Sequence, residues 1–184
     1  MRTEPSDRKN ELGKNGAEHF KEGYNCAQSV LVTMLDHWNL KNELVPKIAT
    51  GFGGGIGRCG SVCGALTGGV MAISIMYGTN EPLMKKRLKA YETAQKFYEQ
   101  FEAQNGSVLC KELIGFDLSV PEQRDKAVKT KAFEEKCTVL VKKTVEILVE
   151  LTQSPYYPPS TSMKYKEKYG ESRTPCREGT EKRS

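Results

Sequence analysis

Six cysteines are the residues of this 184-residue chain with the clearest chemical potential. The first twenty residues are polar and charged and lack the apolar core of a signal peptide, so we expect a cytoplasmic location. Structural disulfides are rare in that compartment, and reduced thiols there indicate metal binding, redox chemistry or simple burial. The six are Cys26, Cys59, Cys63, Cys110, Cys137 and Cys176.

A glycine-rich run directly precedes Cys59 and Cys63. Five of the seven residues from 51 to 57 are glycine, a density that helix and strand interiors resist, so the sequence predicts a loop. Glycine amides can approach a sulfur, an inorganic cluster or a small anion closely because no side chain intervenes. The backbone donors expected in this loop are Gly53, Gly54, Gly55 and Gly57.

The loop leads into an uncharged segment, residues 60–77, with apolar groups on every side of a helix. A helix that is apolar all round is a buried one, so we expect it at the centre of the fold. A helix start at this point leaves Cys59 on the loop rim and Cys63 in the first turn, where free amides and the helix dipole favour a thiolate. A membrane span is the weaker interpretation, because several glycines lower the hydropathy and no aromatic belt flanks the segment.

The other cysteines also lie on predicted helices. Cys26 follows Asn25, a suitable N-cap, and starts a stretch with apolar residues at helical spacing. Cys110 falls in a short helical turn, and Cys137 lies on an apolar i, i+3, i+4 ladder that runs to Leu151. Four cysteines on different elements favour one shared site over independent burial, although the close CxxC pairs of familiar metal motifs are missing.

The fold class expected is all-α, because no stretch alternates with a period of two for long enough to form a strand. We expect a bundle of about six helices around the buried central helix (about 60–77), with the first helix starting at Glu11. Residues 83–104 are expected to form an amphipathic cover helix. Its predicted apolar side carries Leu88, Tyr91, Ala94, Tyr98 and Phe101.

The chain is expected to divide into a helical cysteine-site domain, residues 1–151, and a disordered C-terminal tail, residues 152–184. The tail contains Cys176, is rich in proline and charge, and shows no apolar periodicity. Nucleic acid is not an expected partner, because the net charge of +5 is not gathered into a basic stripe. His19 and His37 are isolated on amphipathic helices and are left out of the site.

The segments Gly23 to Gln28 (GYNCAQ) and Cys63 to Gly68 (CGALTG), with later single cysteines, resemble the redox-active family named for its C_GCAxxG_C_C pattern. The resemblance covers about residues 15–150. It implies a small, soluble, mainly helical prokaryotic protein whose signature cysteines act together, with relatives often encoded beside transporter genes. A related domain looks to occur in the split-Soret type of cytochrome, where cysteines hold an iron–sulfur cluster. By this match the signature set is Cys26, Cys63, Cys110 and Cys137.

Three functions remain open from the sequence. The leading hypothesis is an electron-transfer protein whose four signature cysteines bind an iron–sulfur cluster. Cys59 is a possible additional ligand. The expected partner is a redox protein linked to a membrane transporter. The second is thiol–disulfide chemistry at Cys63, resolved by Cys59. The third is a structural zinc site or a protein without a cofactor. A homodimer is compatible with each, and whether the chain is an enzyme stays open.

Overall fold

The computed structural model describes residues 5–152, and the segments 1–4 and 153–184 lie outside this range. Within it the chain forms helices and one isolated antiparallel bridge, between Val62 and Leu109, and no strand. The prediction of an all-α fold is therefore confirmed. The predicted disordered tail, with Cys176, falls outside the described residues except for Thr152.

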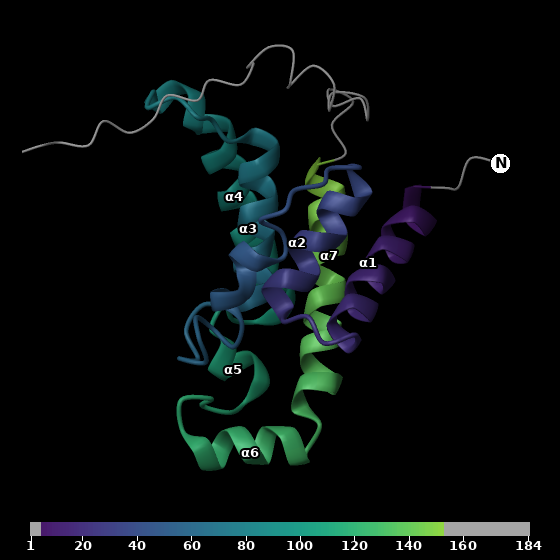
Figure 1. Cartoon of the computed structure of the whole chain (residues 1–184), viewed down its shortest axis with the longest axis vertical. Helices are drawn as coiled ribbons and strands as arrows, with labels where there is room; N and C mark the ends of the chain where they lie inside the picture. The colour runs from purple at the N-terminus through teal and green to yellow at the C-terminus, as the bar shows by residue number, and fades with distance from the viewer. Residues whose placement is uncertain (1–4, 153–184) are drawn as a thin grey trace, which may run out of the picture. The chain divides into compact units, whose positions relative to one another are not determined.

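The long helices lie side by side, and the short helices lie at one end of the bundle (Figure 1). The long helices are α1 (Pro5–Lys21), α2 (Cys26–His37), α3 (Gly64–Tyr77), α4 (Met84–Asn105) and α7 (Thr138–Thr152). The short helices are α5 (Cys110–Ile114) and α6 (Pro121–Lys129). A 3-10 helix, η1 (Lys47–Phe52), precedes the glycine loop, and a π-helix, η2 (Phe133–Cys137), leads into α7.

The helix packed against the most neighbours is α7, which contacts α1, α2, α3 and α4. Its apolar ladder was predicted, and Val141, Val145 and Leu148 are fully or almost fully buried. The expected central helix begins later than predicted, at Gly64, and is buried mainly in its first half; Ile75 near its end is 46% exposed. Within residues 5–152 no helix combines the length and the apolar character needed to cross a bilayer.

The first helix begins at Pro5, six residues before the predicted start at Glu11. Proline suits the first turn of a helix because the N–H that it lacks has no intrahelical partner there. The polar residues after it belong to α1 because the helix packs along α7. Tertiary packing therefore extends a helix whose sequence shows no apolar stripe before Leu12.

The predicted apolar side of the cover helix α4 is confirmed for Phe101 and Ala94, which are buried or pack against the core, and is wrong for three residues. Leu88, Tyr91 and Tyr98 are 48%, 56% and 40% exposed. The buried residues are Ala90, Thr93, Phe97 and Phe101. Gly69 on α3 explains the difference, because a Cβ built there would lie 2.4 Å from Phe97 Cζ. The phenyl ring occupies the space that this glycine leaves, and α4 docks accordingly.

Helices α2 and α3 approach each other closely through two glycines of α3. A Cβ at Gly68 would lie 2.4 Å from the carbonyl oxygen of Ala27, and one at Gly64 would lie 2.5 Å from Cys26 Sγ. Contacts this short are far inside van der Waals distance, so only glycine permits the observed spacing. The small-xxx-small pair therefore fixes how near Cys26 comes to the start of α3.

We predict that Gly68→Ala lowers the free energy of unfolding by about 1–3 kcal/mol, since the added methyl group must displace the α2 backbone. In an uncrowded helix the same change would stabilise by roughly 0.5–1 kcal/mol. Urea denaturation measures the difference.

Gly51→Ala is the matched control, because no heavy atom lies within 4 Å of its built Cβ and its φ is not left-handed. It should leave stability within about 1 kcal/mol of wild type. Equal stability of Gly68→Ala and Gly51→Ala would contradict the packing argument.

Candidate cysteine site

Four cysteines are buried at the ends of four different elements. Cys26 begins α2, Cys63 is the N-cap of α3, Cys110 begins α5 and Cys137 ends η2. Their exposed fractions lie between 4% and 8%, whereas Cys59 on the loop is exposed. The rim position predicted for Cys59 is confirmed, as is the placement of Cys137 on a core face.

The four buried thiols lie near enough to influence one another's ionisation. Burial is the main cause that raises the pKa of Cys137, and the neighbouring Cys26, Cys63 and Cys110 raise it further. Burial and then Cys26 raise the pKa of Cys110 to about 12. The same burial raises the pKa of Cys26. The fold therefore gathers the whole predicted signature set into one electrostatic neighbourhood.

The helix start does not activate Cys63 as a thiolate, contrary to the sequence-based expectation. Its pKa rises to about 12, chiefly by burial and then by the neighbouring Cys26. The amides of Ala65 and Leu66, in the first turn of α3, favour the thiolate and oppose this rise. Desolvation outweighs the helix terminus because the sulfur is withdrawn from water.

Cys26 is surrounded by backbone amides. Those of Gly54, Ala27 and Gly64, together with its own, favour its thiolate, although burial still dominates. Gly54 comes from the glycine loop and Gly64 from α3, so three segments meet at this sulfur. Among the glycines predicted as backbone donors, Gly54 is the one whose amide acts on a cysteine sulfur here.

A capping box fixes the backbone at Cys26. The Asn25 side chain accepts from the amides of Ala27 and Gln28, both at 3.0 Å, and Gln28 Oε1 accepts from the Asn25 amide at 3.1 Å. Asn25 Nδ2 also donates to the Thr50 carbonyl at 2.9 Å, which ties the helix start to η1. The predicted N-cap is thus confirmed, and it also anchors the segment that enters the glycine loop.

The glycine loop is a left-handed spiral. Gly54, Gly55, Ile56, Gly57 and Arg58 have φ between 57° and 71°, a region that favours glycine. Within it the Gly57 amide donates to the carbonyl of residue 51 at 2.8 Å, so this predicted donor is already engaged. A Cβ at Gly55 would lie 2.7 Å from Cys110 Cβ, so Gly55 admits the cysteine rather than serving as a free donor.

A short antiparallel contact holds Cys63 beside Cys110. The Cys63 amide donates to the Val108 carbonyl at 2.8 Å, and the Cys110 amide donates to the Ser61 carbonyl at 2.7 Å. The isolated bridge between Val62 and Leu109 lies between these bonds. Two cysteines that are 47 positions apart are therefore set side by side by backbone pairing.

Cys137 is positioned by the π-helix η2, a wider turn that proteins often place at functional sites. The next residue, Thr138, has the one buried side-chain polar atom without a hydrogen-bond partner within residues 5–152. A buried hydroxyl left unpaired is costly, and it calls for an explanation. Thr138 does not line the cysteine cavity described below, so its hydroxyl is not assigned to the site.

A cavity of about 690 Å³ opens in front of Cys26, Cys110 and Cys137. Cys63 is not in its lining. Three further groups line it: glycines of the loop, apolar side chains, and charged residues at the rim. The glycines are Gly53, Gly54 and Gly57; the apolar residues are Phe20, Leu118, Val128 and Phe133; the charged residues are Arg58, Arg124 and Asp125. Sequence reasoning missed Arg124 and Asp125, because charges on a polar helix look like an ordinary solvated face.

In the thiol form, no three His, Cys, Asp or Glu side chains of the described residues are arranged to hold a metal ion. The four thiols are neighbours all the same, since Cys26, Cys63 and Cys110 all act on the pKa of Cys137.

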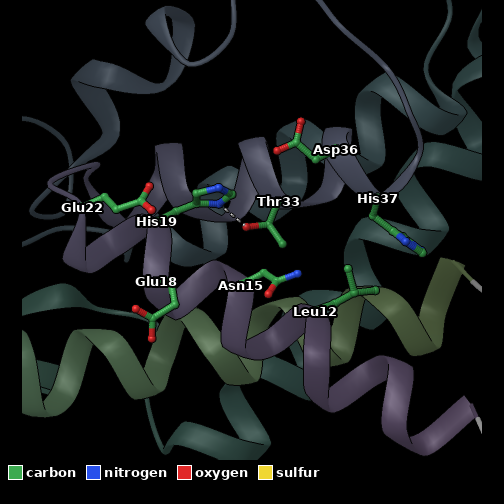
Figure 2. A pocket seen from close by; sticks show the side chains of 8 residues that line it. All are labelled: Leu12, Asn15, Glu18, His19, Glu22, Thr33, Asp36 and His37. Atoms are coloured by element: carbon green, nitrogen blue, oxygen red, sulfur yellow. Dashed lines mark hydrogen bonds between the residues drawn. The ribbon is translucent and has the colours of Figure 1, made fainter. Parts of the chain in front are cut away.

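A second cavity, of about 390 Å³, lies between α1 and α2 and is lined by no cysteine. Figure 2 shows His19 directed toward Thr33, with Nδ1 and Oγ1 2.9 Å apart. The Thr33 hydroxyl donates to the Ser29 carbonyl at 2.7 Å, so it accepts from His19, whose Nδ1 carries the proton. Neither His19 nor His37 lines the cysteine cavity, in agreement with their exclusion from the site.

Comparison with known proteins assigns the family. Residues 24–151 match the family described as "Putative redox-active protein (C_GCAxxG_C_C)", and the chain belongs to this family. An uncharacterized protein of Archaeoglobus fulgidus is 32% identical over 143 residues, which cover 73% of this chain and 88% of the relative. No solved structure matches the chain. The family recognised from the sequence is thus confirmed.

We predict that alkylation separates Cys59 from the four buried cysteines. In metal-free, reduced protein at pH 7.5, iodoacetamide should label Cys59 at least about a hundredfold faster, because a buried sulfur is shielded and held as the thiol. Peptide mass spectrometry with time gives each rate. Labelling in urea should remove the difference, whereas fast native labelling of Cys63 would contradict the burial described here.

We also predict that the Cys63 thiol makes the free energy of unfolding depend on pH. Its pKa is raised from 9.0 to about 12 in the folded chain, so folding favours the neutral thiol. This contribution is fully present below pH 9 and is lost as the pH rises from 9 toward 12. The free energy of unfolding of metal-free protein should fall with pH more steeply in wild type than in Cys63→Ala, by at most about 1.4 kcal/mol per pH unit. Parallel curves for the two proteins would show that this thiol does not titrate as described.

Proposed function

We propose that this protein is an electron-transfer protein in which Cys26, Cys63, Cys110 and Cys137 ligate an iron–sulfur cluster. The observation that carries the proposal is the burial of four mutually interacting thiols from four separate elements. Thiolates are the usual ligands of such clusters, and a set of four from different helices suits cluster ligation. When bound, the cluster would supply one-electron chemistry at a buried position.

The protein groups around the sulfurs support this proposal. Backbone amides at Cys26 and Cys63 favour the charged sulfur, as expected where a ligand thiolate is to be stabilised. Amide donors to cluster sulfurs raise the reduction potential, and Gly54 is placed to act in this way.

The donor set is chemically suitable, because four cysteine thiolates are the usual ligands of such a cluster. Cys137 would be supplied by the end of the π-helix η2, a kind of segment that is frequent at functional sites. Ligation also requires the thiols to lose their protons. With their pKa values raised by burial, the affinity of the metal-free protein for a metal should increase with pH.

Thiol–disulfide exchange at Cys63 is the second hypothesis, and the site favours it less. A thiol with a pKa of about 12 is ionised in only about one molecule in 10⁵ at pH 7, and the thiolate is the attacking species. Cys59, the predicted resolving residue, is exposed on the loop while Cys63 is buried. The two cannot meet without opening the segment between them.

A structural zinc site is the third hypothesis and uses the same sulfurs. It predicts no redox activity and a fold that loosens on chelation. The four cysteines alone do not separate zinc from a cluster, so metal analysis is the deciding measurement. An electron-donating protein partner, linked to a membrane transporter, belongs to the cluster hypothesis and not to this one.

We predict that anaerobic purification, or reconstitution with iron and sulfide, gives a brown protein containing both elements. Cys26→Ala, Cys63→Ala, Cys110→Ala and Cys137→Ala should each lose most of the iron, and Cys59→Ala should retain it as the matched control. Iron, sulfide and zinc are measured on the same samples, with circular dichroism to verify folding. A colourless wild type that contains zinc or no metal after reconstitution would reject the cluster.

A further inference from the structure

The rim of the cysteine cavity carries two arginines that enter it from different parts of the chain. Arg58 comes from the glycine loop, and Arg124 comes from α6. Neither guanidinium has an ion-pair partner among residues 5–152. Both side chains line the same cavity, and a bound anion would supply the negative charge that neither has as an ion-pair partner.

The backbone at Arg58 supports a role for this side chain. Arg58 has a φ of 71°, in the left-handed region that disfavours every residue with a Cβ. Glycines fill most of the neighbouring left-handed positions, so an arginine here is a local exception. Strain of this kind persists where the surrounding structure holds it and often marks a functional position.

We propose that Arg58 and Arg124 form a binding site for a small, multiply charged oxyanion at the mouth of the cysteine cavity. Guanidinium groups donate paired hydrogen bonds whose geometry matches that of anionic oxygens. Gly53 and Gly54 of the glycine loop line the same cavity, where they leave room because they carry no side chain. A ligand held here lies beside Cys26, Cys110 and Cys137.

Asp125 also lines this cavity, and its carboxylate limits the affinity of the site for an anion. Because the carboxylate repels a bound anion, the site should bind anions in the millimolar range. Removal of the Asp125 charge should make the binding tighter. The role of the oxyanion as a substrate of the cysteine centre rests on the proposed function. Its binding does not, because the arginines and the cavity are present without a cluster.

The test is titration calorimetry of the full reduced chain with sodium sulfate, at constant ionic strength set with sodium chloride. Wild type should bind sulfate, and Arg58→Gly and Arg124→Gln should each weaken binding at least tenfold. Asp125→Asn should tighten it several-fold. Arg87→Gln is the matched control, since Arg87 lies on α4 and outside the cavity lining, and it should leave binding unchanged.

Arg58→Gly distinguishes a binding role from a structural one. Glycine accepts the left-handed φ without strain, so the variant should unfold at the same or a higher temperature while it loses sulfate binding. A lower unfolding temperature together with unchanged sulfate binding would assign Arg58 to the loop structure and overturn the proposal. Absence of sulfate binding by wild type, or an equal loss in Arg87→Gln, would also overturn it.

Two further measurements identify the class of ligand and test the anion site and the iron–sulfur cluster independently of each other. Acetate at the same ionic strength should bind at least tenfold more weakly than sulfate, and equal binding would reject a site for multiply charged anions. Iron content is measured on the same variants and should not change. A chain that binds sulfate but never iron contradicts the cluster alone, whereas a chain that binds iron but no sulfate contradicts the anion site alone.

Discussion

The close approach of α3 to α2 is the contact on which the rest of the site depends. Gly64 lies against Cys26 Sγ and Gly68 lies against the Ala27 carbonyl, at distances that exclude any side chain. This contact places the N-cap Cys63 beside Cys26. The bridge between Val62 and Leu109 then brings Cys110 to the same place, and α7, which packs on both helices, carries Cys137 through η2. Moving the two helices apart would separate Cys26 from the paired Cys63 and Cys110.

Desolvation governs the chemistry of these thiols more strongly than the local dipoles do. Amides of Gly54, Gly64 and the first turn of α3 all favour thiolates, yet burial keeps the pKa of each cysteine raised. A site of this kind is a poor nucleophile by itself. Thiols buried in this way would become charged only if a cation compensated them, since a positive centre supplies the interaction that water would otherwise provide.

The left-handed spiral of the glycine loop divides the cysteines into two groups. It directs the backbone of Gly54 toward Cys26 and admits Cys110 against Gly55, while it leaves Cys59 in solvent. It also brings Arg58 into the lining of the cavity that Cys26, Cys110 and Cys137 line. One short segment thus contributes to the burial of two thiols and supplies a positive charge to the same cavity.

The sequence by itself determined the helical class, the loop at residues 51–57, the Asn25 cap and the identity of the signature cysteines, because periodicity, caps and motifs depend on residues that are near in the chain. Tertiary structure alone decided which face of α4 is buried, since Phe97 docks where Gly69 leaves space. It also decided that the pKa of Cys63 is raised and that Arg58 and Arg124 line the same cavity. These properties depend on desolvation and on contacts between distant segments, which no local pattern records.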